Sequence, residues 1–102
     1  MKDPQPLFAA LSDPTRRAVF ERLTSQGPAS ATTLAAELPV SRQAVSKHLA
    51  ALDEAGLAER TSVGREVRYS AVVDPLSDVT AWVSKVGSEW DTRLERLRRS
   101  FS

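Results

Sequence analysis

The sequence predicts a small, mainly α-helical domain with one β-hairpin near its C-terminal end, followed by a single long helix. Three observations predict this fold class. Up to Gly56 the apolar residues recur every three or four positions, which is the period of helices packed on a core. From Leu57 the pattern changes to the alternation typical of strands, and after Pro75 the helical period returns. The expected order is four helices, two strands and one helix.

Length and composition indicate one folded domain over residues 1–102. A chain of 102 residues has room for only a modest core, so burial against a partner is a reasonable expectation. Its 41% apolar and 26% charged residues are typical of a folded domain, and no apolar run approaches the ~20 residues of a membrane span. The first residues lack the apolar stretch of a secretory signal. We therefore expect a cytoplasmic protein with no membrane partner.

Composition also limits the chemistry. Cysteine is absent, which excludes disulfides, thiolate metal sites and cysteine nucleophiles. The net charge is only +1, so an interaction with nucleic acid must rest on the local distribution of charge. The sequence contains no phosphate-binding loop, nucleophile elbow or paired-carboxylate pattern. We expect no enzymatic activity, no catalytic residue and no cofactor.

Three Asp-Pro pairs predict helix starts, because aspartate can cap a helix and proline is tolerated at its first position. They are Asp3-Pro4, Asp13-Pro14 and Asp74-Pro75. Gly27, followed by a proline, is expected to stop the second helix. The apolar positions expected on the first two helices are Leu7, Phe8 and Leu11, then Ala18, Val19, Phe20 and Leu23.

The third and fourth helices are predicted to be capped by Ser30 and Ser41. Pro39 ends the third helix, because the residue before a proline is pushed out of the helical region. The short connection that remains is typical of a helix-turn-helix, here over about residues 30–56, and Gly56 supplies a left-handed stop. The inward positions expected on these helices are Leu34, Ala35 and Leu38, then Val45, Leu49 and Leu52.

The alternating segment predicts a hairpin over about residues 57–73, joined by a turn at residues 63–65. Helices followed directly by a hairpin make a winged helix, in which the second helix of the helix-turn-helix enters the major groove of DNA. The hairpin tip then reaches the neighbouring backbone. We expect one face to carry Leu57, Val67, Tyr69 and Ala71, and the other Glu59, Arg60, Arg65, Glu66 and Arg68.

The last helix, over about residues 75–100, carries a long apolar stripe. Its surface exceeds what a domain of this size readily covers alone, and such surfaces usually pack against a partner. Packing on the domain's own core remains the alternative. The stripe comprises Leu76, Val79, Val83, Val86, Trp90, Leu94, Leu97 and Phe101.

Three stretches resemble the ArsR-type winged-helix transcription regulators: ALSDPTRRAVFERL, LAAELPVSRQAVSKHLAALDEAGL and GREVRYSA. The pattern W-x-x-R-L at residues 90–94 is similar to the cysteine-free branch of that family. The resemblance implies a homodimeric, sequence-specific DNA-binding repressor whose first and last helices form the dimer interface. The interface residues that we expect are Leu7, Phe8, Leu11, Trp82, Val83, Val86, Trp90, Leu94 and Leu97.

The candidate DNA-reading surface is the polar front of the fourth helix, formed by Ser41, Arg42, Gln43, Ser46 and Lys47. Residues 41–49 hold two cations and no acid, although the whole chain is nearly balanced. Gln pairs with adenine, Lys with guanine, and Ser with either partner type, whereas Arg42 lies nearer the edge and suits a phosphate. A merely solvated helix face is the alternative.

The hairpin offers two further candidate DNA contacts. Arg65 at the tip suits a phosphate or a narrow minor groove, while Arg68 suits either DNA or an ion pair on the strand face. Arg16 and Arg17 are interpreted as structural braces, with contact to backbone phosphate as the alternative.

His48 is the only histidine and has no second histidine or cysteine to complete a metal site, so we expect a partly buried, locally hydrogen-bonded helix residue. Metal-sensing members of the resembled family use cysteines in the third helix or clustered histidines and acids in the last helix, and neither pattern occurs. We expect no metal. Trp82 and Trp90 are expected to pack, with a ligand pocket at the dimer interface as the alternative.

The overall prediction is a homodimeric repressor bound to a partly palindromic operator in double-stranded DNA. Its two recognition helices would enter successive major grooves about 34 Å apart. Two alternatives remain open: a winged-helix module that binds another protein, and a ligand-responsive sensor with an unidentified effector.

Overall fold

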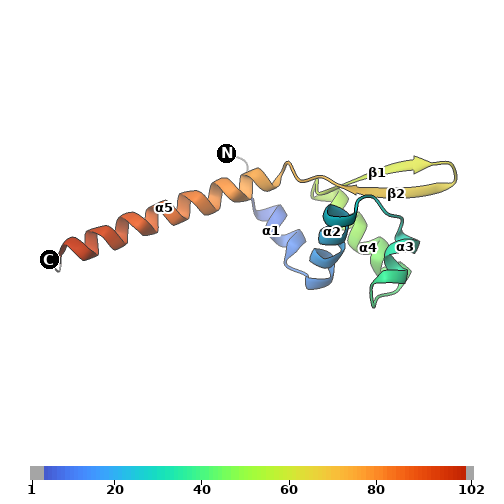
Figure 1. Ribbon diagram of the computed structural model, residues 1–102, viewed down its shortest axis with the longest axis horizontal. Coiled ribbons are helices and arrows are strands. Elements are labelled where there is room, and N and C mark those ends of the chain that lie inside the picture. Colours follow the sequence, from blue (N-terminus) through green and yellow to red (C-terminus); the bar gives the residue numbers. More distant parts are fainter. Residues whose placement is uncertain (1–3, 101–102) are drawn as a thin grey trace.

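The computed structural model describes residues 4–100 and confirms the predicted fold class, a winged helix-turn-helix. The elements α1–α4 form a helical head, from which a hairpin projects on one side and α5 on the other (Figure 1), giving extents of 67 × 27 × 21 Å. The bounds are α1 Gln5–Leu11, α2 Pro14–Gln26, α3 Ala31–Glu37, α4 Arg42–Glu54, β1 Ala58–Val63, β2 Glu66–Ala71 and α5 Leu76–Ser100.

Side-chain caps begin α2, α3 and α4, as the sequence predicts. Asp13 accepts hydrogen bonds from the backbone N–H groups of Thr15 and Arg16, at 2.8 and 3.0 Å. The Arg16 bond is the main reason that the pKa of the Asp13 carboxyl lies below its usual value. Ser30 and Ser41 each accept a hydrogen bond from the backbone N–H three residues further on.

The other two Asp-Pro pairs also precede helices, as predicted. Pro4 occupies the N-cap position of α1 and offers no side-chain oxygen, and Asp3 lies outside the described residues. Helix α5 begins at Leu76, and its first turn is closed by backbone bonds such as that from the Ser77 N–H to the Asp74 carbonyl at 3.1 Å. At the start of α5 the fixed φ of Pro75 directs the chain into the helix, and no side-chain cap is present there within residues 4–100.

The core lies between the four helices of the head and the base of the hairpin. The predicted inward residues of α4 are fully buried, together with Leu34 and Leu57. Val19, Phe20 and Leu23 bury the predicted face of α2, whereas Ala18, Ala35 and Leu38 are half-buried. Helix α2 ends at Gln26, and Gly27 has a φ of 90°, which glycine adopts without strain.

The hairpin has a two-residue turn, and its strands pair from Ala58↔Ala71 to Val63↔Glu66. Gly64, with a φ of 63°, is the first turn residue, as type II′ turns require. The predicted alternation of burial appears in β2 but not in β1, which is exposed after Ala58 because the hairpin extends beyond the head (Figure 1). Tyr69 and Ala29 exchange two backbone hydrogen bonds, at 2.9 and 3.1 Å, which fix the hairpin to the α2–α3 loop.

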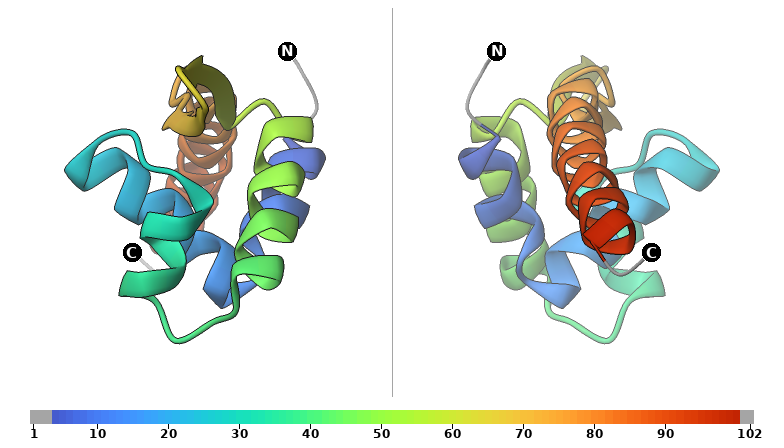
Figure 2. Two further views of the ribbon diagram at one scale, coloured as in Figure 1. Left: turned by 90° about the vertical axis from the view of Figure 1, so that its right-hand side faces the viewer. Right: turned by 90° about the vertical axis from the view of Figure 1, so that its left-hand side faces the viewer.

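Helix α5 extends away from the head (Figures 1 and 2). Most of its apolar stripe is exposed. Only its first turns pack on the head: Leu76 and Val79 contact the core, and Trp82 meets Phe8 edge to face at 5.3 Å between ring centroids. The alternative in which the stripe packs on the domain's own core is therefore wrong for Val83 and from Trp90 onward, whereas Val86 is half-buried. The exposed fractions are 55% for Val83, 55% for Trp90, 49% for Leu94 and 54% for Leu97.

Two of the predicted interface positions, Leu7 and Leu11, pack within their own copy of the protein. Leu7 is only 4% exposed and belongs to the core of its own copy, so we correct the predicted interface by removing it. Leu11 is half-buried and packs against the same core. Phe101, the last predicted residue of the stripe, lies outside the described residues.

None of the helices within residues 4–100 is long and apolar enough to span a membrane.

Candidate nucleic-acid interface

All five residues of the polar front of α4 are exposed. The Ser41 hydroxyl is used by its cap, since it accepts the Ala44 N–H at 3.1 Å. Arg42 and Ser46, one helical turn apart, line a hollow that faces the hairpin. Gln43 and Lys47, the next pair around the helix, lie outside the hollow and have no side-chain partner within residues 4–100. The polar front thus divides into a pair that faces the hairpin and a pair that faces outward.

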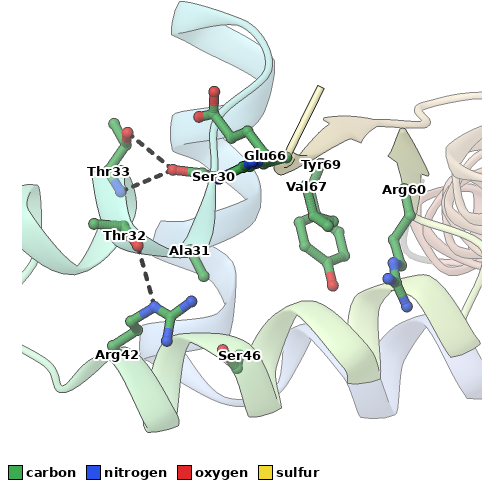
Figure 3. Close-up of a pocket in the computed structure, with 11 residues that line it drawn as sticks. Ser30, Ala31, Thr32, Thr33, Arg42, Ser46, Arg60, Glu66, Val67 and Tyr69 are labelled. Atoms are coloured by element: carbon green, nitrogen blue, oxygen red, sulfur yellow. Dashed lines mark hydrogen bonds between the residues drawn. The ribbon is translucent and has the colours of Figure 1, made fainter. Parts of the chain in front are cut away.

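The hollow measures about 660 Å³ and lies between α3, the first half of α4 and the hairpin. Figure 3 shows Arg60 and Tyr69 extending from the hairpin toward α4, where Arg42 and Ser46 lie. Arg65 at the hairpin tip also lines it. Three arginines and one acid, Glu66, line the hollow, so its charge is positive.

Arg42 is held in place by the helix that precedes it. Its Nε donates to the Thr32 Oγ1 at 3.1 Å, which joins the start of α4 to α3 (Figure 3). A guanidinium has five N–H donors, so this bond leaves both terminal nitrogens of Arg42 for a ligand. Thr32 carried no signal in the sequence, because its role depends on how α3 lies against α4.

The arginines of the hairpin differ in their contacts. Arg65, at the tip, is exposed and has no partner within the described part of the chain. Arg68 forms an ion pair with Glu66 at 3.3 Å, with both side chains exposed, which is the strand-face alternative. Arg60 lies directly opposite Tyr69 in the strand register, so the two share one face. The sequence prediction that placed Arg60 on the other face from Tyr69 is therefore wrong.

Arg16, Arg17 and His48 occupy structural positions. The Arg16 Nε donates to the His48 Nδ1 at 3.4 Å, and the Arg17 Nη1 donates to the Leu11 carbonyl at 3.2 Å. Both bonds fit the interpretation of these arginines as braces. His48 is half-buried as predicted, but its partner is 32 residues away in the chain rather than local. Within residues 4–100 no group of three or more histidine, cysteine or acidic side chains is placed to hold a metal.

An ion pair between Arg22 and Glu37 fixes α2 to α3, and it had no periodic signal in the sequence. The guanidinium contacts both carboxylate oxygens, one of them at 3.2 Å through Nη2, and also donates to the Gly27 carbonyl at 3.1 Å. The hydrogen bonds between the partners raise the pKa of Arg22 and lower that of Glu37. The pair thereby joins α2 to α3, the first helix of the helix-turn-helix.

Comparison with known proteins decides the family. Residues 11–61 match the family described as Helix-turn-helix domain. The solved structure of an ArsR-like transcriptional regulator from Rhodococcus sp. RHA1 is similar with a TM-score of 0.81 and 44% identity, covering 93% of this chain and 89% of that one. The chain belongs to the ArsR-type helix-turn-helix transcription regulators.

Two further relatives of this ArsR-type regulator are similar in sequence. The transcriptional repressor SdpR of Bacillus subtilis is 30% identical over 88 residues, which are 86% of this chain and 97% of SdpR. The HTH-type transcriptional regulator Rv2034 of Mycobacterium tuberculosis is 50% identical over 56 residues, which are 55% of this chain. That match spans about half of Rv2034, 51% of its length.

The family match covers only part of the candidate interface. It ends at Thr61, inside β1, and so includes the whole polar front of α4 and Arg60. Arg65 and Tyr69 lie beyond it. Both residues line the hollow beside α4.

Proposed function

We propose that this ArsR-type regulator is a homodimeric, sequence-specific DNA-binding repressor that acts in the cytoplasm. The observation that carries the proposal is the division of the α4 front. Gln43 and Lys47 face outward without partners, beside a hollow lined by three arginines. The outward pair matches the donors and acceptors of base edges, and the arginines match the phosphodiester backbone.

In the proposed complex α4 lies in the major groove of double-stranded DNA. Gln43 and Lys47 read bases, while Arg42 and Ser46 face the backbone strand that borders the groove. The free amides at the start of α4, beyond Ser41, suit a phosphate oxygen. The hairpin tip places Arg65 at the adjacent narrow groove.

The dimer is proposed from the uncovered stripe of α5. Its exposed residues need a partner, and a second copy of α5 offers the same apolar surface about a two-fold axis. Arg93 lies 5.7 Å from the Trp90 ring, where it covers part of the indole and leaves the rest for the partner. The proposed interface consists of Phe8, Leu11, Trp82, Val83, Val86, Trp90, Leu94 and Leu97.

A two-fold dimer requires a partly palindromic operator, with the two α4 helices about 34 Å apart. Bound there, the protein represses by occluding RNA polymerase. Phosphate contacts make the affinity fall as salt rises, because bound counterions are released.

The test is binding selection from a pool of random duplexes, combined with sedimentation of the free protein. The proposal expects an enriched pair of inverted half-sites spaced by about one helical turn, and a dimer in dilute solution. Retention without any enriched sequence would contradict the sequence-specific function and favour a protein-interaction module. A monomer at the concentration where DNA is bound would contradict the two-fold arrangement.

A further inference from the structure

We infer that the hollow between α4 and the hairpin seats a phosphodiester group of the DNA backbone, and that Arg60 and Tyr69 contact DNA there together with Arg42 and Ser46. The inference rests on the proposed function. It adds Arg60 and Tyr69 as DNA contacts, which neither the helix-turn-helix motif nor the position of the hairpin tip predicts.

The geometry brings four polar groups to one place from two sides. Arg60 and Tyr69 are direct cross-strand neighbours, and both extend toward α4 (Figure 3). Within residues 4–100 the Arg60 guanidinium and the Tyr69 hydroxyl have no hydrogen-bond or ion-pair partner. Tyr69 is half-buried and packs against the core, and its side chain points toward α4 (Figure 3).

The electrostatics select an anion. Among the described residues that line the hollow, Glu66 is the only acid, and its carboxylate is paired with Arg68. Arg42, Arg60 and Arg65 therefore contribute a positive field with little competition from within the protein. Guanidinium N–H groups and a phenolic O–H are the donors that suit phosphate oxygens, and charge-assisted hydrogen bonds are the strong ones.

The position of the hollow identifies the source of the phosphate. In a winged helix the recognition helix occupies the major groove and the hairpin tip reaches the neighbouring backbone. The DNA strand that separates these two places must pass between α4 and the hairpin, and the hollow lies between them. Its volume of about 660 Å³ is in the range that admits a phosphate with its flanking sugars.

Both walls of the hollow are fixed before DNA arrives. The hairpin wall is joined to the α2–α3 loop by the two backbone bonds between Tyr69 and Ala29. The helix wall is joined to α3 by the bond from Arg42 to Thr32. A site assembled in advance loses less conformational entropy on binding, so even one phosphate contact contributes to affinity.

The first experiment measures the affinity of the full chain for its selected duplex by fluorescence anisotropy over a range of salt. Arg60→Ala should weaken all duplexes alike and lower the slope of log K against log salt by about one, because one phosphate contact is lost. Tyr69→Phe should weaken binding about tenfold and leave the slope unchanged, because the hydroxyl is neutral. The control is Lys85→Ala, on α5 away from the hairpin. It removes the same charge and should change neither the affinity nor the salt slope.

The second experiment replaces single phosphates of the duplex, one at a time, by neutral methylphosphonates. The wild-type protein should lose affinity at each contacted phosphate, and Arg60→Ala should be insensitive at one of those positions. If Arg60→Ala keeps the wild-type profile and slope, this inference is overturned while the proposed function stands. A wild-type protein that binds no duplex would overturn both. Circular dichroism and thermal unfolding of each variant exclude loss of fold as the cause.

Discussion

Helices α4 and α5 are both amphipathic, yet a single copy of the protein buries the apolar side of only one of them. Val45, Leu49 and Leu52 of α4 are 0% exposed, whereas Trp90 and Leu97 of α5 are 55% and 54% exposed. In α4 the apolar side belongs to the core, so its polar side remains for a ligand. In α5 the apolar side itself remains exposed. The pattern alone predicts that a face is buried but not against which partner.

The largest effect is expected from truncating the buried side of α4. Leu49→Ala should lower the free energy of unfolding by about 2–5 kcal/mol, because the cavity forms in a core that cannot fully collapse. Urea denaturation measures the loss, with the exposed neighbour Ala50→Ser as control. A loss below about 1 kcal/mol would mean that this side of α4 is not packed as described.

The same truncation on α5 should instead act on assembly. Trp90→Ala is expected to raise the dimer dissociation constant at least about thirtyfold, because a large aromatic side chain at an interface centre is typically worth 2 kcal/mol or more. The helical head should keep its fold, since its core does not include Trp90. Sedimentation of dilute protein measures the shift, and Thr92→Ala, which the helical spacing places on the opposite side, is the control. A dimer that persists unchanged would break the contrast between the two helices.

The contrast also explains which features were predictable from the sequence. The caps of Asp13, Ser30 and Ser41 and the buried stripe of α4 depend on residues at most a few positions apart, so local patterns predict them. Leu7 is different, because its periodicity is equally compatible with the core and with an interface. Only the packing of α1 against the rest of the head decides between them.

The hairpin register shows why part of the candidate site could not be predicted. A turn at residues 63–65 would place Arg60 opposite Arg68, whereas the two-residue turn pairs Arg60 with Tyr69. A shift of one residue in register moves side chains to the other face of a strand. The sequence pattern therefore could not predict the hollow between Arg60, Tyr69 and α4. The hydrogen bond between Arg42 and Thr32 could not be predicted from the sequence either, because it depends on how α3 and α4 pack.

Substitution on the polar side of α4 should change the recognition of DNA. It should change neither the stability of the fold nor the assembly of the dimer. Gln43→Ala is expected to relax base preference by about 1–3 kcal/mol at one base pair, through loss of a bidentate contact. The salt slope should stay the same, because the amide is neutral. Binding selection with the variant measures the preference. An unchanged enriched sequence would mean that Gln43 does not read a base.

Arg65→Ala should have the opposite signature, because the hairpin tip is proposed to contact the backbone or a narrow groove. All sequences should weaken alike, and the slope of log K against log salt should fall by about one. Anisotropy on the selected and a scrambled duplex measures both quantities. A loss confined to the selected duplex would show that Arg65 reads sequence directly.

The smallest effect tests how far the ligand surface of α4 extends onto the hairpin. Arg68→Ala should weaken DNA binding about two- to fivefold, because it leaves Glu66 unpaired beside the bound phosphate and exposed charges interact weakly. The double variant Arg68→Ala/Glu66→Gln restores the net charge and removes that repulsion, so it should bind as the wild type does. If Arg68 itself contacts DNA, the double variant will remain weak. Anisotropy at low salt, where exposed charges are least screened, separates the two outcomes and decides whether Arg68 acts on DNA or through Glu66.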